Sequence, residues 1–133
     1  MNYLLDTNHL SPIITIHHPL RFKILDHRQR NDRFFVPTPV LSEFLFGLRG
    51  LPRLSQNLQE WENLKNDFNY YSIQPSIAED AALLRSNLRQ KGRQLGLVDA
   101  FCAVIALRDN LTFLTADTDF HAIPALRQEN WLI

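Results

Sequence analysis

Near its start the sequence reads Tyr3-Leu4-Leu5-Asp6-Thr7-Asn8, a short apolar run that ends abruptly in polar side chains. Such a run is typical of a buried strand in a parallel sheet, and the polar residues mark its carboxyl end. In open α/β sheets, ligands bind just outside the carboxyl ends of the strands. This stretch therefore predicts a central strand that delivers Asp6 to a binding crevice.

Strands and helices are expected to alternate along the rest of the chain. The pattern predicts strands at 34–36, 70–73 and 111–115, and an edge strand at 131–133. It predicts helices at 38–49, 54–68, 76–91 and 97–110, after a helical region at 11–32 that Pro12 and Pro19 break. This alternation favours one domain over residues 1–133, a three-layer α/β/α sandwich with a central, mostly parallel sheet.

Three helix boundaries carry capping signals. Thr38 is expected to cap the helix that Pro39 opens. Ser76 and Glu79 have the spacing of a capping box. Asn110 suits the left-handed position that ends a helix.

The overall charge is balanced, since 14 Lys and Arg residues face 14 Asp and Glu residues. A protein that holds nucleic acid by counterion release alone usually has a clear basic excess. The balance argues against a simple nucleic-acid-binding module. It leaves room for an enzyme that meets nucleic acid through a local patch or through metal ions.

The single cysteine, Cys102, lies in an apolar run and is expected to be a buried core residue. One cysteine allows neither an intrachain disulfide nor a cysteine-based zinc site. The sequence shows no apolar stretch long enough to span a membrane and no signal-peptide pattern. We therefore expect a cytoplasmic protein.

Acidic residues recur where strands end and helices begin. Asp117 follows the strand at 111–115, Asp99 lies near a helix start, and Glu43 sits among apolar residues of another helix. If the strands before Asp6 and Asp117 are neighbours, their carboxylates meet. Clustered carboxylates repel one another unless a hard cation such as Mg²⁺ or Mn²⁺ neutralises them. Each acid alone would suit a turn, a cap or a solvated helix, so the joint pattern carries the metal-site hypothesis.

Four motifs in register closely resemble the signatures of PIN-domain nucleases, above all the VapC-type toxins of type II bacterial toxin–antitoxin pairs. They are Leu4-Leu5-Asp6-Thr7-Asn8, Ser42-Glu43-Phe44-Leu45-Phe46-Gly47, Leu97-Val98-Asp99-Ala100 and Leu114-Thr115-Ala116-Asp117-Thr118-Asp119-Phe120. The end of the chain, 123–131, is also similar to the usual ending of that subgroup. Each motif is weak alone, but together they cover almost the whole chain.

The resemblance implies a ribonuclease that cleaves single-stranded RNA with Mg²⁺ or Mn²⁺ and an activated water. It also implies a cognate antitoxin as partner and a homodimer. The metal-binding acids would be Asp6, Glu43, Asp99 and Asp117, with Asp119 as an alternative or additional acid, and Thr7 or Asn8 together with Thr115 would orient the metal water or a carboxylate.

His9 departs from the apolar residue that is common at its place in the family. We expect it to be a polar helix-start residue rather than a metal ligand.

A basic run precedes Asp99 and offers two interpretations. Arg85 and Arg89 lie one helical turn apart, and Lys91 and Arg93 continue toward Asp99. Such a run is commonly a solvated helix face. The functional alternative is that these side chains grip RNA phosphates beside the acids.

Two other enzyme classes fit poorly. A haloacid-dehalogenase-type phosphatase needs a second Asp where this chain has Asn8, and a receiver domain needs a late Lys, whereas no Lys follows Lys91. Two alternatives within the PIN fold stay open: a housekeeping RNA-processing nuclease without an antitoxin, and a non-catalytic RNA-binding or scaffold protein. The presence of all four acids argues against the non-catalytic form.

Overall fold

The computed structural model describes residues 1–133 and contains one five-stranded sheet in the order β3-β2-β1-β4-β5. Every neighbouring pair of strands is parallel. The strands are β1 (Asn2–Leu5), β2 (Arg33–Pro37), β3 (Asn69–Tyr71), β4 (Thr112–Leu114) and β5 (Gln128–Glu129).

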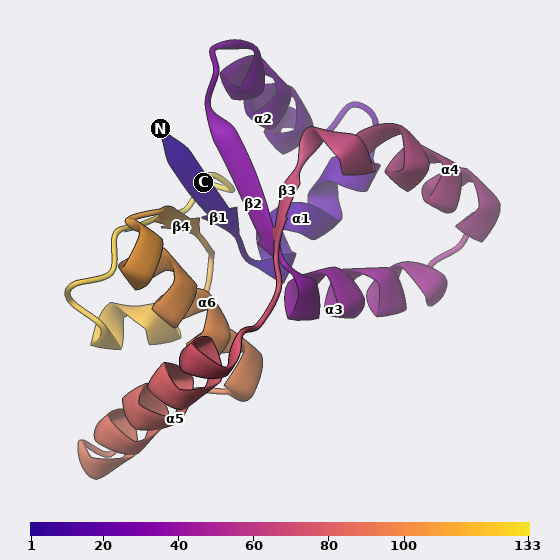
Figure 1. The fold of residues 1–133 in the computed structure, drawn as a ribbon. Helices are drawn as coiled ribbons and strands as arrows, with labels where there is room; N and C mark the ends of the chain where they lie inside the picture. Colours follow the sequence, from indigo (N-terminus) through magenta and orange to yellow (C-terminus); the bar gives the residue numbers. More distant parts are fainter.

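Helices cover both faces of this sheet and complete the expected three-layer α/β/α sandwich (Figure 1). The α6 helix contacts β4 and carries α5 on its outer side, whereas α2 and α3 contact β2. The helical segments are α1 (Thr7–Leu10), η1 (Ser11–Ile14), α2 (Pro19–Gln29), α3 (Thr38–Arg49), α4 (Leu54–Leu64), η2 (Lys65–Asp67), α5 (Pro75–Gln90), α6 (Leu97–Asp109) and η3 (Thr118–Ala122).

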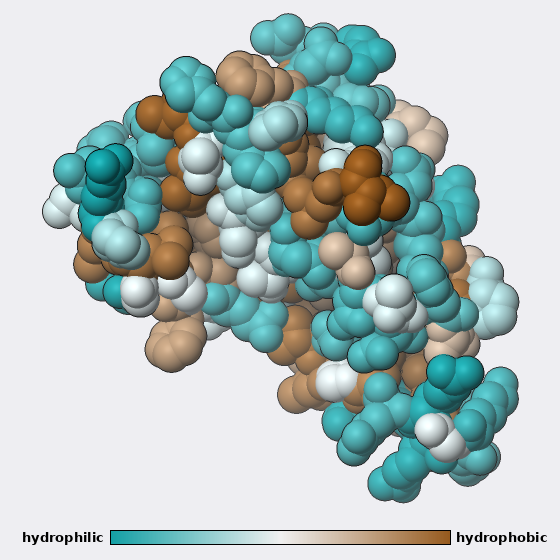
Figure 2. Space-filling model, turned by 180° about the vertical axis from the view of Figure 1, so that it is seen from behind, coloured by the Kyte–Doolittle hydropathy of each residue, from teal (hydrophilic) through white to brown (hydrophobic).

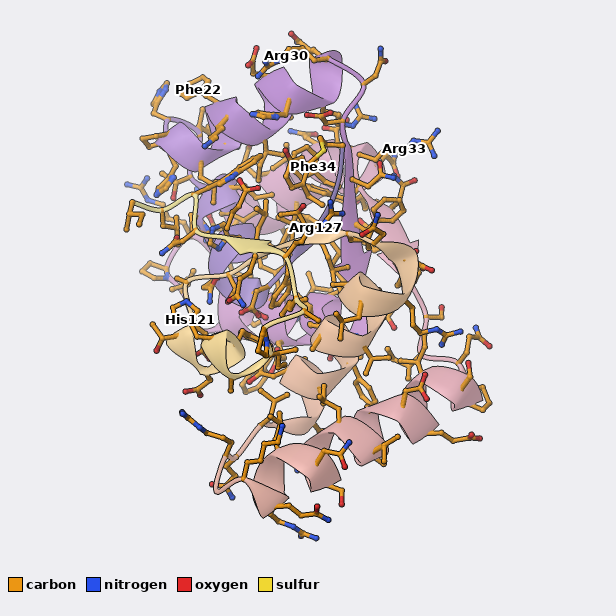
Figure 3. The ribbon with its side chains drawn as sticks, turned by 90° about the vertical axis from the view of Figure 1, so that its left-hand side faces the viewer. Phe22, Arg30, Arg33, Phe34, His121 and Arg127 are labelled. Carbon is orange, nitrogen blue, oxygen red and sulfur yellow. The ribbon has the colours of Figure 1, made fainter.

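Alternating side chains of the strands build the core on the two faces of the sheet. Tyr3 and Phe34 are register partners whose rings stack 5.2 Å apart, and Tyr3 also meets His27 of α2. Figure 3 shows Phe34 inside the molecule beneath α2. At the other end of the sheet, the Tyr71 hydroxyl donates to the Asp109 carboxylate of α6. Both helical layers are thereby fastened to the same sheet.

The strand order reverses at β1: β2 and β3 lie on one side of it, and β4 and β5 lie on the other. Leu5 is the register partner of Leu114, and the backbone N–H of Asp6 donates to the Leu114 carbonyl at 3.0 Å. Such a reversal opens a crevice at the carboxyl ends of the strands. The condition set from the sequence, that the strands before Asp6 and Asp117 be neighbours, is therefore met.

Several expected boundaries are wrong, and each has a local cause. Pro37 rather than Thr38 is the cap residue of α3, and it makes no side-chain cap bond. Gln74 precedes α5 because Pro75 opens it, so the Ser76 capping box does not form. Residues 131–133 form no strand, and the edge strand is β5 instead. Asn110 ends α6 in the left-handed conformation, as expected, with φ 57°.

Most large apolar side chains are buried, but the rings of Phe22, Phe46 and Tyr70 are exposed. Phe44, Trp61 and Phe68 belong to the core, whereas Phe46 on α3 is 81% exposed. Figure 3 shows Phe22 projecting from the outer side of α2. The expected burial of Cys102 is confirmed. None of the helices combines the length and the apolar character needed to cross a membrane.

Candidate metal centre

Asp6 is held in one orientation at the end of β1. Its Oδ1 accepts a hydrogen bond from the Thr7 backbone N–H at 2.8 Å, which caps α1. Its Oδ2 accepts from the Thr115 hydroxyl at 2.7 Å and from Asn8 Nδ2 at 3.1 Å. The side chain is nearly buried, with 7% of the residue exposed. Three of the polar residues expected at the site thus fix the position of this carboxylate.

Asp117 is tied to the same spot through Thr115. Its backbone N–H donates to the Thr115 hydroxyl at 3.0 Å, so one hydroxyl links Asp117 to Asp6. The Asp117 Oδ1 accepts from the Asp119 N–H at 2.9 Å and caps η3. Its second oxygen, Oδ2, has no protein donor. Asp119 is exposed, and its backbone contact to Asp117 is its one hydrogen bond with the acids.

Glu43 reaches the site from α3, on the other side of Asp6. The Thr7 hydroxyl donates to Glu43 Oε1 at 3.0 Å. Glu43 is exposed despite its apolar neighbours in the sequence, because α3 turns Val40, Phe44 and Leu48 toward the core. Thr7 therefore links α1 to α3 beside the carboxylate of Asp6.

Asp99 lies in the first turn of α6, where the helix dipole favours an anion. Burial raises the pKa of Asp99 to about 6, and the charges of Asp6, Asp117, Glu43 and Asp119 contribute to this rise in that order. Burial also raises the pKa of Asp6, against its hydrogen bonds, and the nearby Asp117 and Glu43 charges add to this. The structure thus brings all the predicted acids within electrostatic range of one another.

No cation of the protein compensates this negative charge, since every ion pair in the molecule lies elsewhere. Oxygen donors of this kind suit Mg²⁺ or Mn²⁺. As the side chains stand, no three carboxylate, imidazole or thiol groups already enclose an ion. The residues therefore fit a hard divalent cation by donor chemistry and uncompensated charge, and the bound ion stays a prediction.

Three of the four basic residues singled out from the sequence gather at one cavity. Arg85, Arg89 and Arg93 line a hollow of about 290 Å³ between the end of α5 and residues 94–95. Arg85 Nε donates to the Leu95 carbonyl at 2.9 Å, so this side chain also holds the loop before α6. Lys91 does not line the cavity. The free end of α5 forms a hydrophilic projection at the lower right of Figure 2.

His9 is a residue of the site whose role the sequence did not reveal. It belongs to α1, as expected, but it is fully buried, and burial lowers its pKa to about 4. Nδ1 lies 2.7 Å from Asn8 Oδ1, and Nε2 accepts from the Trp131 backbone N–H at 3.0 Å. With both nitrogens engaged, His9 is not available as a ligand. The only signal in the sequence was its departure from the usual apolar residue.

The chain is similar to known proteins in sequence. The family model described as PIN domain matches residues 3–126. Ribonuclease VapC2 of Rickettsia felis is 27% identical over 132 residues, which cover 98% of each chain.

Solved structures show the same arrangement of the chain. In the crystal structure of VapBC2 from Rickettsia felis, bound to a DNA fragment from their promoter, one chain matches with TM-score 0.85 and 26% identity, covering 98% of this chain and 99% of that chain. A chain of VapBC-1 from nontypeable Haemophilus influenzae matches with TM-score 0.78 and 25% identity, with both chains covered completely.

Proposed function

The chain belongs to the PIN domain family, and on that basis we propose that it is a VapC-type ribonuclease that hydrolyses single-stranded RNA with the help of Mg²⁺ or Mn²⁺. One observation carries the proposal. The charges of Asp6, Glu43, Asp117 and Asp119 all raise the pKa of Asp99, and no basic side chain forms an ion pair with any of these five acids. Likeness to a named ribonuclease supports the same chemistry.

Asp6, Asp99 and Asp117 would hold the metal, with Glu43 completing the set. A bound ion of this kind polarises a phosphate and lowers the pKa of water. Asp6 is the most rigid of these residues, because its oxygens accept from Thr7, Asn8 and Thr115. Glu43 is exposed and restrained only by Thr7, so it is free to accept a proton from water at the site.

We assign the fourth acidic position to Asp117 rather than Asp119. Asp117 is connected to Asp6 through Thr115, and its charge acts on both Asp6 and Asp99. The charge of Asp119 raises the pKa of Asp99 less than the charges of the other acids do, and it is not among the causes of the raised pKa of Asp6. Its backbone N–H orients Asp117, so Asp119 would act as an outer residue of the centre.

RNA would be held by the arginine-lined cavity near the amino end of α6. Arg89 and Arg93 are exposed and make no ion pair, so their guanidinium groups are available for phosphate oxygens. Arg85 would contribute mainly by holding the Leu95 carbonyl. Because Asp99 lies in the first turn of the helix that follows this loop, a strand bound here would lead to the acids.

The partner of such a ribonuclease would be an antitoxin protein in the cytoplasm, and the toxin itself would form a homodimer. Two of the structural relatives were solved as VapBC assemblies. A housekeeping nuclease without an antitoxin has the same site and differs only in its partner. Co-purification of the chain with the product of an adjacent small gene would separate these two roles.

The catalytic proposal is tested by cleavage of end-labelled single-stranded RNA in Mg²⁺, Mn²⁺ or EDTA. We expect metal-dependent cutting by the wild type and loss of cutting by Asp6→Asn. Asp80→Asn is the matched control, because Asp80 is an exposed acid on α5 outside the cluster. Cutting that persists in Asp6→Asn, or that survives EDTA, would contradict the proposal.

A further inference from the structure

His9 joins two parts of the chain that are far apart in the sequence. Its Nε2 accepts from the backbone N–H of Trp131, 122 residues away. A backbone N–H can only donate, so Nε2 carries no proton and the neutral ring carries its proton on Nδ1. That proton points at Asn8 Oδ1, 2.7 Å away. The hydrogen bond with Trp131 therefore determines which atom His9 offers to Asn8.

Asn8 receives this donor on the oxygen side of its amide. Oδ1 accepts from His9 Nδ1 and also from the Ala116 backbone N–H at 3.1 Å. Two donors on one side fix which end of the amide is oxygen. The amide nitrogen must then face Asp6 Oδ2, to which it donates at 3.1 Å. A flipped amide would set its NH₂ group against two donors and an oxygen against the Asp6 carboxylate.

The far end of this chain of hydrogen bonds is firmly anchored. The Trp131 ring lies 4.9 Å from Tyr3 and 4.7 Å from His27, and Lys23 Nζ lies 4.2 Å from its centroid. Its indole N–H donates to Glu129 Oε1. In Figure 1 the C-terminal segment runs beside β1, where these contacts place it.

We propose that His9 is a positioning residue that sets the orientation of the Asn8 amide, and through it the Asp6 carboxylate, while the Trp131 N–H determines which ring nitrogen of His9 donates. The proposal rests on the proposed function only in taking Asp6 as a metal ligand. The hydrogen bonds run in one direction, from Trp131 through His9 and Asn8 to Asp6. Partners that orient a metal ligand commonly change metal affinity by about 10- to 100-fold when removed.

Two substitutions separate the two hydrogen bonds of His9. His9→Asn keeps an amide near the position of Nδ1, where it can donate to Asn8, but it cannot reach Trp131. His9→Gln keeps an amide near the position of Nε2, where it can accept from Trp131, but it no longer donates to Asn8. His9→Leu removes both hydrogen bonds. His27→Leu is the control, since it loosens the packing of Trp131 without reaching Asn8.

The experiment measures Mn²⁺ affinity by calorimetry, together with the melting temperature and the side-chain NH₂ signals of Asn8 in the metal-free protein. We expect about tenfold weaker Mn²⁺ binding in His9→Gln and His9→Leu and broadened or shifted Asn8 NH₂ signals. His9→Asn should rescue both readouts, although all variants melt at lower temperature. His27→Leu should lower the melting temperature alone.

Equal Mn²⁺ affinity and unchanged Asn8 signals in folded His9→Gln would overturn the proposal. So would losses that follow the melting temperature across all variants, His27→Leu included, because they would mark a purely structural role. If the wild type binds no Mn²⁺, the proposed function fails. The Asn8 signals then decide the positioning role by themselves, since they are read without metal.

Discussion

The Thr115 hydroxyl donates to Asp6 Oδ2 at 2.7 Å across 109 residues of sequence, in a buried setting. The same hydroxyl accepts from the Asp117 N–H at 3.0 Å. One small side chain therefore joins the ends of β1 and β4 and sets two carboxylates relative to one another. The buried hydroxyl of Thr115 thus makes two hydrogen bonds that an apolar side chain could not make.

Replacing Thr115 by Val keeps the shape and removes the hydroxyl. Asp6 and the Asp117 N–H each lose a partner, so the free energy of unfolding should fall by about 2 kcal/mol. Metal affinity should fall as well, by about tenfold. Urea denaturation and Mn²⁺ titration measure the two effects. Thr112→Val is the control: Thr112 is buried on β4, as Thr115 is just beyond the strand end, but makes no hydrogen bond to the acids, so metal affinity should be unchanged.

Asp99 should make the free energy of unfolding of the metal-free protein fall as the pH rises. The pKa of Asp99 is raised from 3.8 to about 6, so between these values the folded protein holds a proton that the unfolded chain releases. The stabilisation that this proton gives the folded protein is complete below about pH 4 and is lost as the pH rises through about 6. The melting temperature of Asp99→Asn should therefore be higher than that of the wild type at pH 7.5 and equal to it near pH 4. Equal melting temperatures at pH 7.5 would show that burial and the neighbouring charges do not raise the pKa of Asp99 in the folded protein.

Asp117 and Asp119 should differ in their effect on the metal centre. Asp117→Asn should weaken Mn²⁺ binding by more than about 100-fold if Asp117 is a ligand. Asp119→Asn should weaken it by about tenfold or less, because the backbone N–H of residue 119 that orients Asp117 stays in place. Calorimetry on the two variants makes the comparison. The reverse order would move the fourth acid to Asp119.

The arginine-lined cavity should account for part of the salt dependence of RNA binding. Removing one arginine that binds a phosphate should flatten the slope of log affinity against log salt by about 0.7 for a single strand. Arg89→Gln and Arg93→Gln should each show this change in a catalytically inactive background, Asp6→Asn. Lys91→Gln serves as control because Lys91 lies outside the cavity. An unchanged slope in both arginine variants would remove the cavity from the RNA path.

The fold and the approach of Asp6 to Asp117 were predictable because they depend largely on local patterns. Asp6 and Asp117 each follow an apolar strand, and parallel strands place such residues at one edge of the sheet. The adjacency of β1 and β4 could only be posed as a condition, since no local pattern encodes it. Asp99 was recognised from its place at a helix start, which the structure confirms.

The elements whose bounds were predicted wrongly depend on long-range contacts or on competing local signals. At 131–133 the apolar side chains suggested a strand, but Trp131 turns its ring into a cluster with Tyr3 and His27. Its backbone N–H binds His9 instead of a neighbouring strand. At α5, Pro75 preceded the Ser76 signal and opened the helix first. The position of His9 between two segments 122 residues apart has no counterpart in any local pattern.

Calorimetric titration of the metal-free protein with Mn²⁺ tests most directly whether the acids around the ends of β1 and β4 form a divalent-metal centre. We predict saturable binding by the wild type and by Asp80→Asn, and none by the double variant Asp6→Asn/Asp99→Asn, with circular dichroism confirming that each is folded. Absence of binding by the folded wild type, or equal binding by the double variant, would contradict the account.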